Sequence, residues 1–188
     1  MAIFYCNITI ISRDDVLSAV AAAAYRAGEI ITSEQERTTY TYTHKTGIAY
    51  KEILLPESAP AEYKDRATLW NRAEKVEDAQ SAGLAIEITV ALPMELSLQQ
   101  NIELARMYVE TNFVAHGMYA DLCVHDDSVV NPHAHIMLPL TLADTSIIDL
   151  DEQTIVEKWS AAWVEAVNSR LEELNLTERI YYRPQGIA

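Results

Sequence analysis

Two histidines separated by one residue, His133 and His135, are the part of this sequence best suited to do chemistry. Apolar residues alternate after them and predict a strand, on which residues two positions apart face the same side. A third histidine, His125, ends another apolar run, and the polar segment between the runs contains Asn-Pro, which favours a hairpin loop. If the two strands pair, facing side chains lie about 5 Å apart. Three neutral imidazoles with open coordination positions are typical of a reactive metal site.

Each histidine also has a plainer interpretation. A buried imidazole is more often a satisfied core side chain than a ligand, and two on one strand face can coincide by chance. Because the hairpin register is assumed, spacing alone leaves both interpretations open.

Length and composition predict a single domain with a sizeable core. The chain has 188 residues, 49% of them hydrophobic, and lacks an apolar stretch long enough to span a membrane. Its two cysteines, Cys6 and Cys123, lie in apolar runs and are expected to be buried free thiols. Free thiols favour a cytoplasmic protein, and no signal peptide is recognisable at the N-terminus. Fourteen basic residues face twenty-eight acidic ones, which argues against general nucleic-acid binding.

The periodicity predicts six strands and four helices in the order βαββαβαββα. Because strands outnumber parallel crossovers, the expected fold is α+β, a mainly antiparallel sheet with helices packed on one face. Thr38–Thr43 and Ile48–Leu55 are expected to form a hairpin with each other. The other predicted strands are Ile3–Ile11, Leu84–Leu92, Tyr119–His125 and His133–Leu142, and the helices are Val16–Gly28, Ala61–Ala79, Ser97–Phe113 and Glu152–Leu174.

Five motifs, in order along nearly the whole chain, resemble those of the MobA/MobL (MobQ) plasmid-mobilisation relaxases, members of the HUH endonuclease superfamily. In an HUH motif two histidines flank an apolar residue, which here is Ala134. The resembling segments are Ser18–Gly28, Glu52–Pro56, Ala85–Pro93, His125–Met137 and Trp159–Leu171. The resemblance implies a relaxase-like palm spanning residues 1–188, either as a whole protein or as the N-terminal part of a longer one.

The resemblance implies a specific activity. A relaxase of this family nicks and rejoins one DNA strand at a plasmid transfer origin through a covalent 5′-phosphotyrosine, and the motif places that tyrosine at Tyr25. It also implies a divalent ion, Mg²⁺ or Mn²⁺, on His125, His133 and His135. It places Glu87 near them, either orienting a histidine or acting as a base. Without the resemblance, Tyr25 would be a packing residue and Glu87 a solvent-facing carboxylate.

The implied partners are single-stranded transfer-origin DNA and accessory mobilisation proteins, with no membrane. DNA contacts are expected from Arg26 and from the basic and aromatic run that contains Tyr40, Tyr42 and Lys45, because bases stack on aromatic rings and phosphates attract cations. An ordinary edge hairpin with alternating tyrosines would have the same residues.

Two other functions remain open. The acidic balance fits a degenerate, non-catalytic relaxase that regulates or scaffolds a mobilisation complex. A related HUH replication initiator is the second alternative, but such initiators usually place the tyrosine after the histidine motif, whereas Tyr25 precedes it.

Overall fold

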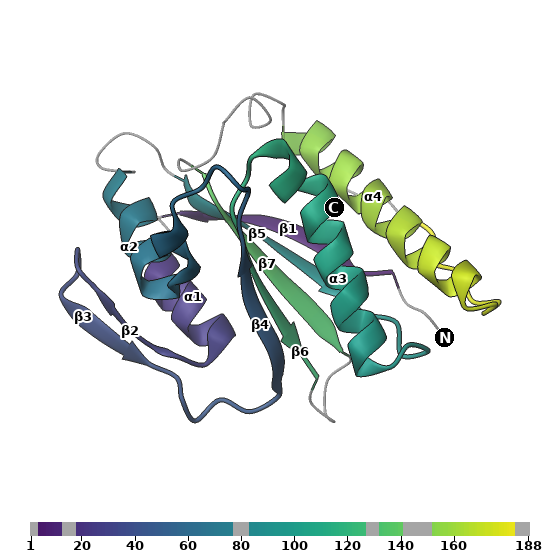
Figure 1. The fold of residues 1–188 in the computed structure, drawn as a ribbon, viewed down its shortest axis with the longest axis horizontal. Helices are drawn as coiled ribbons and strands as arrows, with labels where there is room; N and C mark the ends of the chain where they lie inside the picture. Colours follow the sequence, from purple (N-terminus) through teal and green to yellow (C-terminus); the bar gives the residue numbers. More distant parts are fainter. Residues whose placement is uncertain (1–3, 13–17, 77–82, 127–131, 141–151, 183–188) are drawn as a thin grey trace, which may run out of the picture.

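The computed structural model describes residues 4–12, 18–76, 83–126, 132–140 and 152–182. In this part of the chain, a five-stranded sheet carries helices on both sides, and a two-stranded ribbon lies beside one helix pair (Figure 1). Every strand pair is antiparallel. The predicted α+β class with a mainly antiparallel sheet is therefore confirmed.

The large sheet has the strand order β1-β5-β7-β6-β4. Its members are β1 (Cys6–Ser12), β4 (Ile48–Leu54), β5 (Gly83–Ala91), β6 (Ala120–His125) and β7 (His133–Pro139). The central strands β5, β7 and β6 are almost continuously buried, as expected for strands covered on both faces. The three strands that hold Glu87 and the histidines are thus the most enclosed part of the sheet.

The predicted hairpin between residues 38–43 and 48–55 is wrong. Strand β3 (Thr38–Thr41) pairs with a strand that the sequence did not reveal, β2 (Ile30–Ser33), while β4 pairs with β6. A tight turn at residues 34–37 joins β2 to β3, with Arg37 at φ 53°. Because the C-terminal residues of β4 are buried on both faces, this strand requires neighbours within the large sheet.

Helices lie on both faces of the sheet, so the expectation of one covered face is wrong. Helices α1 (Ala19–Ala27) and α2 (Arg66–Val76) pack in one apolar cluster with Ala85 and Met137. Helices α3 (Leu98–Asn112) and α4 (Glu152–Glu173) pack in the other, which contains apolar residues of the alternate positions of β5, β6 and β7. Figure 1 shows the two helix pairs well separated. We call the side that carries α1 and α2 the site face.

The helix ends follow the capping residues. Ser18 caps α1 by accepting a bond from the Ala21 amide at 3.1 Å, and Gly28, at φ 62°, ends the helix as predicted. Residues 13–17, where the helix was expected to begin, lie outside the described part. Ser97, where this helix was predicted to begin, is the N-cap of α3, and the structure adds a capping box with Gln100.

The predicted helix at 61–79 is two elements over residues 61–76, a short 3-10 turn η2 (Ala61–Lys64) and α2, and residues 77–79 lie outside the described part. The break falls at Asp65, whose extended backbone interrupts the helix. Its carboxylate accepts bonds from the Thr68 amide at 2.8 Å and the Thr68 hydroxyl at 2.7 Å. A side chain that caps the second helix therefore separates it from the first turn.

Candidate metal and nucleophile site

Three histidines meet at one end of the site face. His125 ends β6 opposite His133, the first residue of β7, and His135 follows on the same face. The ring centroids of His125 lie 5.2 Å from His133 and 4.8 Å from His135, and those of His133 and His135 lie 5.0 Å apart. One nitrogen of each ring lies within 4.8 Å of the others. The predicted hairpin pairing is confirmed, although residues 127–131 of its loop are outside the described part.

Hydrogen bonds to neighbouring groups fix two of the rings. Nε2 of His125 lies 2.7 Å from the Arg26 carbonyl oxygen, which can only accept, so this nitrogen carries the proton. Nδ1 of His135 lies 2.9 Å from Oε1 of Glu87 and 3.2 Å from the Thr89 hydroxyl. A ring nitrogen that donates outward leaves the other one with its lone pair for a ligand.

The histidines fit a divalent metal in protonation as well as in geometry. The pKa of His125 is lowered to about 4, mainly by burial; the nearby Lys45 contributes to the lowering, and the bond to the Arg26 carbonyl opposes it. Burial also lowers the pKa of His135. Both rings are therefore neutral at neutral pH, the form in which imidazole binds a metal.

Glu87 is a buried carboxylate, 8% exposed, and not a solvent-facing one. Besides His135, it accepts bonds from Arg26 Nε at 2.6 Å and Arg26 Nη2 at 2.9 Å, a fork that engages both carboxylate oxygens. Burial alone would raise the pKa of Glu87, but the hydrogen bonds from His135 and Arg26 outweigh it and lower the value to about 2. Such a weakly basic carboxylate is suited to orienting His135 and poorly suited to taking a proton.

Tyr25 lies in the last turn of α1, next to the residue whose carbonyl binds His125. Its side chain is 44% exposed, in contrast to the buried alanines of the same helix. The Tyr42 ring meets its ring edge-on at a centroid distance of 5.2 Å, and Lys45 Nζ lies 3.8 Å from its centroid. The exposed Tyr25 is therefore adjacent in the chain to the residue whose carbonyl His125 binds.

Comparison with known proteins places the chain in a family. The model of the MobA/MobL family matches residues 17–146, which include every residue of the cluster and Tyr25. This chain belongs to the MobA/MobL family. The family recognised from the five motifs is confirmed.

Relatives and a solved structure agree with this assignment. The chain is 40% identical to a conjugal transfer protein TraA of Rhizobium radiobacter over 78% of this chain and 14% of the relative. It is 30% identical to the mobilization protein MobL of Acidithiobacillus ferridurans over 97% of this chain and 58% of the relative. A chain from the structure "Molecular Basis of Vancomycin Resistance Transfer in Staphylococcus aureus" matches at TM-score 0.86 and 28% identity, covering 97% of this chain and 99% of the other. The chain therefore spans a small part of TraA and somewhat over half of MobL.

In this MobA/MobL chain, the four residues expected to contact DNA have different surroundings. Tyr42 and Lys45 lie against Tyr25, whereas the guanidinium of Arg26 is engaged by Glu87. The Tyr40 hydroxyl donates to Glu36 on the β2–β3 ribbon, and this bond is the main cause that raises the pKa of Tyr40 to about 12. Arg26 also lies by Tyr25, with its guanidinium carbon 5.2 Å from the ring centroid, so of the four residues Tyr40 alone is not brought to the candidate nucleophile. DNA contact by any of the four stays a prediction.

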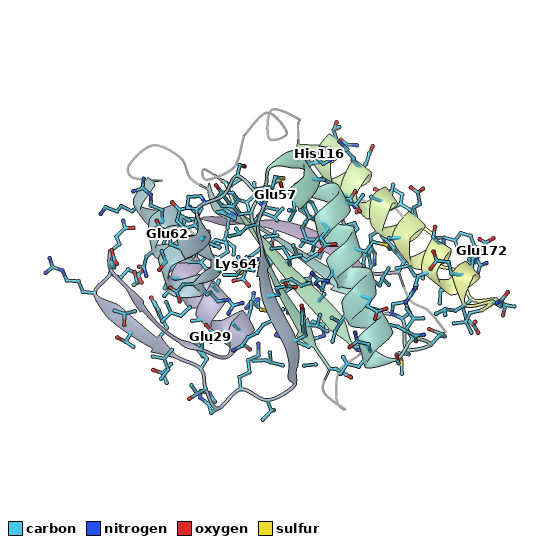
Figure 2. All side chains as sticks on the ribbon, viewed as in Figure 1. Glu29, Glu57, Glu62, Lys64, His116 and Glu172 are labelled. Carbon is cyan, nitrogen blue, oxygen red and sulfur yellow. The ribbon has the colours of Figure 1, made fainter. Side chains whose placement is uncertain are left out.

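A buried hydrogen-bond network that the sequence did not reveal lies on the same face of the sheet as the histidines. Asp121, on the site face of β6, accepts bonds from Arg66 at 2.8 and 2.9 Å and from Trp70 at 2.8 Å. Arg66 also contacts Glu29, just beyond α1, where Figure 2 labels it. A carboxylate in an apolar strand requires a partner, so Asp121 was the available signal. Its arginine, 55 positions away, could not be identified from spacing.

Other predictions about the chain have mixed outcomes. Cys6 and Cys123 are buried free thiols, as expected. No helix among the described residues is long and apolar enough to cross a membrane. His116, labelled in Figure 2, lies in the turn η3 (Val114–His116) before β6, at the opposite end of that strand from His125. Within the described residues, the three histidines form the one group that meets the geometric criteria for a metal site.

Proposed function

We propose that this chain is the catalytic domain of a conjugative relaxase, which nicks and rejoins single-stranded DNA at a plasmid transfer origin. The observation that carries the proposal is the hydrogen bond from His125 to the carbonyl of the residue after Tyr25. It links an accessible tyrosine to three clustered imidazoles through one peptide unit. The names of the relatives, conjugal transfer and mobilization proteins, support the same role.

In the proposed reaction, the Tyr25 oxygen attacks the scissile phosphorus. The bond between phosphorus and the Tyr25 oxygen forms, the bond to the 3′ oxygen breaks, and a proton from solvent completes the 3′ hydroxyl. Because Tyr25 is nearly half exposed, its phenolic proton can leave to water. The phosphodiester energy is retained in the tyrosine ester, so attack by a 3′ hydroxyl rejoins the strand without ATP.

His125, His133 and His135 are the residues that would hold a divalent ion. When bound there, such an ion supplies positive charge for the non-bridging phosphate oxygens. Of the two ions implied by the resemblance, Mn²⁺ suits three imidazoles better, because Mg²⁺ strongly prefers oxygen ligands and retained waters. The proposed role of Glu87 is to orient His135, since its pKa of about 2 makes it a poor base at neutral pH.

The distribution of acidic residues lessens the conflict between charge and DNA binding. Helices α3 and α4 contain seven acidic and three basic residues, and they cover the face opposite the histidines. Figure 2 labels one of the acidic residues, Glu172, on α4. Lys45 and Lys51, by contrast, lie at the C-terminal end of α1. We infer that DNA approaches this end and that the carboxylates of α3 and α4 disfavour other approaches.

The overall charge of −14 favours one alternative, a degenerate domain that scaffolds or regulates a mobilisation complex with accessory proteins. An assay with end-labelled single-stranded transfer-origin DNA separates the two functions. With Mn²⁺ or Mg²⁺, the proposed enzyme should give one discrete product on a denaturing gel and a protein-linked fragment. Binding of accessory proteins without any cleavage under either metal would favour the scaffold.

A further inference from the structure

The loop after β3 holds a lysine against the candidate nucleophile. Lys45 Nζ donates a hydrogen bond to the Tyr25 carbonyl oxygen at 3.0 Å and lies 3.8 Å from the centroid of the Tyr25 ring. The loop itself is closed by a bond from the Lys45 amide to the Tyr42 carbonyl at 3.0 Å. One side chain therefore contacts both the backbone and the ring of the same tyrosine.

Lys45 is one of three side chains that satisfy the end of α1. The last carbonyls of a helix have no partner within it and carry partial negative charge, so cationic donors are stabilising there. Lys45 donates to the carbonyl of Tyr25, His125 to the next one, and Lys51 to that of Ala27 at 3.1 Å. Lys45 differs from Lys51 because it also contacts the face of the Tyr25 ring.

We propose that Lys45 is a positioning residue for Tyr25, which holds the ring in the orientation from which its oxygen reaches the scissile phosphate. A cation over the face of a tyrosine ring is attracted by the ring quadrupole. The edge-on ring of Tyr42, with its centroid 5.2 Å away, restricts the same ring from another side. The exposed phenol is thereby ordered without being buried. This inference rests on the proposed function.

The competing role for Lys45 is a simple phosphate contact. The two roles differ in what they change: a phosphate contact adds affinity for DNA in the ground state, whereas a positioning contact changes the rate after DNA has bound. Misplacement of a reacting atom by about 1 Å can reduce a rate about 100-fold. The ratio between the effects on rate and on affinity therefore distinguishes them.

The experiment compares wild type with Lys45→Met, Lys45→Arg and Lys51→Met. Single-turnover formation of the covalent adduct is measured with saturating transfer-origin DNA, and the Kd for the same DNA is measured without metal. Lys51→Met is the control, because it removes a bond to the same helix end and an ion pair with Glu29 but no ring contact. In metal-free protein labelled with 3-fluorotyrosine, the Tyr25 resonance is assigned by its absence in Tyr25→Phe.

We expect Lys45→Met to slow adduct formation about 10- to 100-fold with little change in Kd. Lys45→Arg should restore the rate, since a guanidinium also stacks on aromatic rings. The Tyr25 resonance should shift in Lys45→Met and stay in place in Lys51→Met.

Three results would overturn the inference: a weaker Kd with an unchanged rate, no change in either, or equal slowing by Lys45→Met and Lys51→Met. If wild type forms no adduct, the proposed function fails by itself. The fluorine spectrum then still decides whether Lys45 orders the Tyr25 ring.

Discussion

Glu87→Gln offers a direct test of how the site is organised. Glu87 accepts three bonds, one from His135 Nδ1 at 2.9 Å and two from Arg26 at 2.6 and 2.9 Å. A glutamine has the same shape but only one accepting oxygen, so its amide group would face a donor on either His135 or Arg26. It also leaves the Arg26 charge without its counter-charge, close to a site that would receive a cation.

The expected magnitude follows from these two effects. Loss of an outer partner of a metal-binding histidine typically weakens metal affinity about 10- to 100-fold, or about 1.4 to 2.7 kcal/mol. The variant keeps the volume of Glu87 but loses the buried ion pair with Arg26, so folding stability should fall as well, and the metal affinity is compared between folded proteins. We therefore expect the Mn²⁺ affinity of Glu87→Gln to fall within this range.

Titration calorimetry with Mn²⁺ on metal-free protein at neutral pH measures the difference. Glu103→Gln is the matched control, because Glu103 also binds an arginine, Arg170, but on the exposed surface of α3. Combining Glu87→Gln with Arg26→Met should recover part of the affinity by removing the uncompensated charge. An affinity of Glu87→Gln equal to that of Glu103→Gln would refute the orienting role of Glu87.

Three further predictions concern pH, backbone strain and salt. Metal-free protein should lose at most about 3 kcal/mol of stability through His125 as pH falls from 6.5 to about 4, because unfolded histidine takes up a proton that buried His125 resists. Urea titrations should show this step, and His125→Asn should reduce it to the part that His135 contributes, since the pKa of His135 is lowered as well. Gly28→Ala should destabilise the protein by about 1–3 kcal/mol in the same urea titration, since Gly28 has φ 62° and an added Cβ would lie 2.4 Å from Ile48 Cδ1. An unchanged urea midpoint of unfolding would contradict this geometry. The affinity for single-stranded DNA, plotted against salt concentration on logarithmic axes, should have a slope of about −1.4 to −2.8, equivalent to two to four neutralised phosphates, and removing the metal should weaken DNA binding more than adding salt does. A steeper slope would mean that the basic surface is larger than we infer.

The histidine cluster could be predicted because it depends on local sequence patterns. The two-residue period of a strand placed His133 and His135 on one face, and the polar segment before them placed His125 opposite. Helix ends at Gly28 and Ser97 were predictable for the same reason, since capping depends on residues only a few positions apart.

Features that depend on distant residues could not be predicted from local patterns. The two-sided helix packing, the ribbon of β2 with β3 and the pairing of β4 with β6 depend on which apolar surfaces meet in three dimensions. Likewise, nothing in the local sequence matched Arg26 to Glu87, 61 positions away. The exposed Tyr25 was singled out by the motif of its family, because a tyrosine after four alanines has no chemical signature of its own.

In the proposed reaction, Tyr25 becomes covalently joined to DNA beside the three histidines. Intact-mass spectrometry after incubation with single-stranded transfer-origin DNA and Mn²⁺, followed by peptide mapping, tests it most directly. We predict one oligonucleotide adduct, located on Tyr25, absent from Tyr25→Phe and retained by Tyr5→Phe, a control at another exposed tyrosine. An adduct that persists in Tyr25→Phe, or that maps to another residue, would contradict the account.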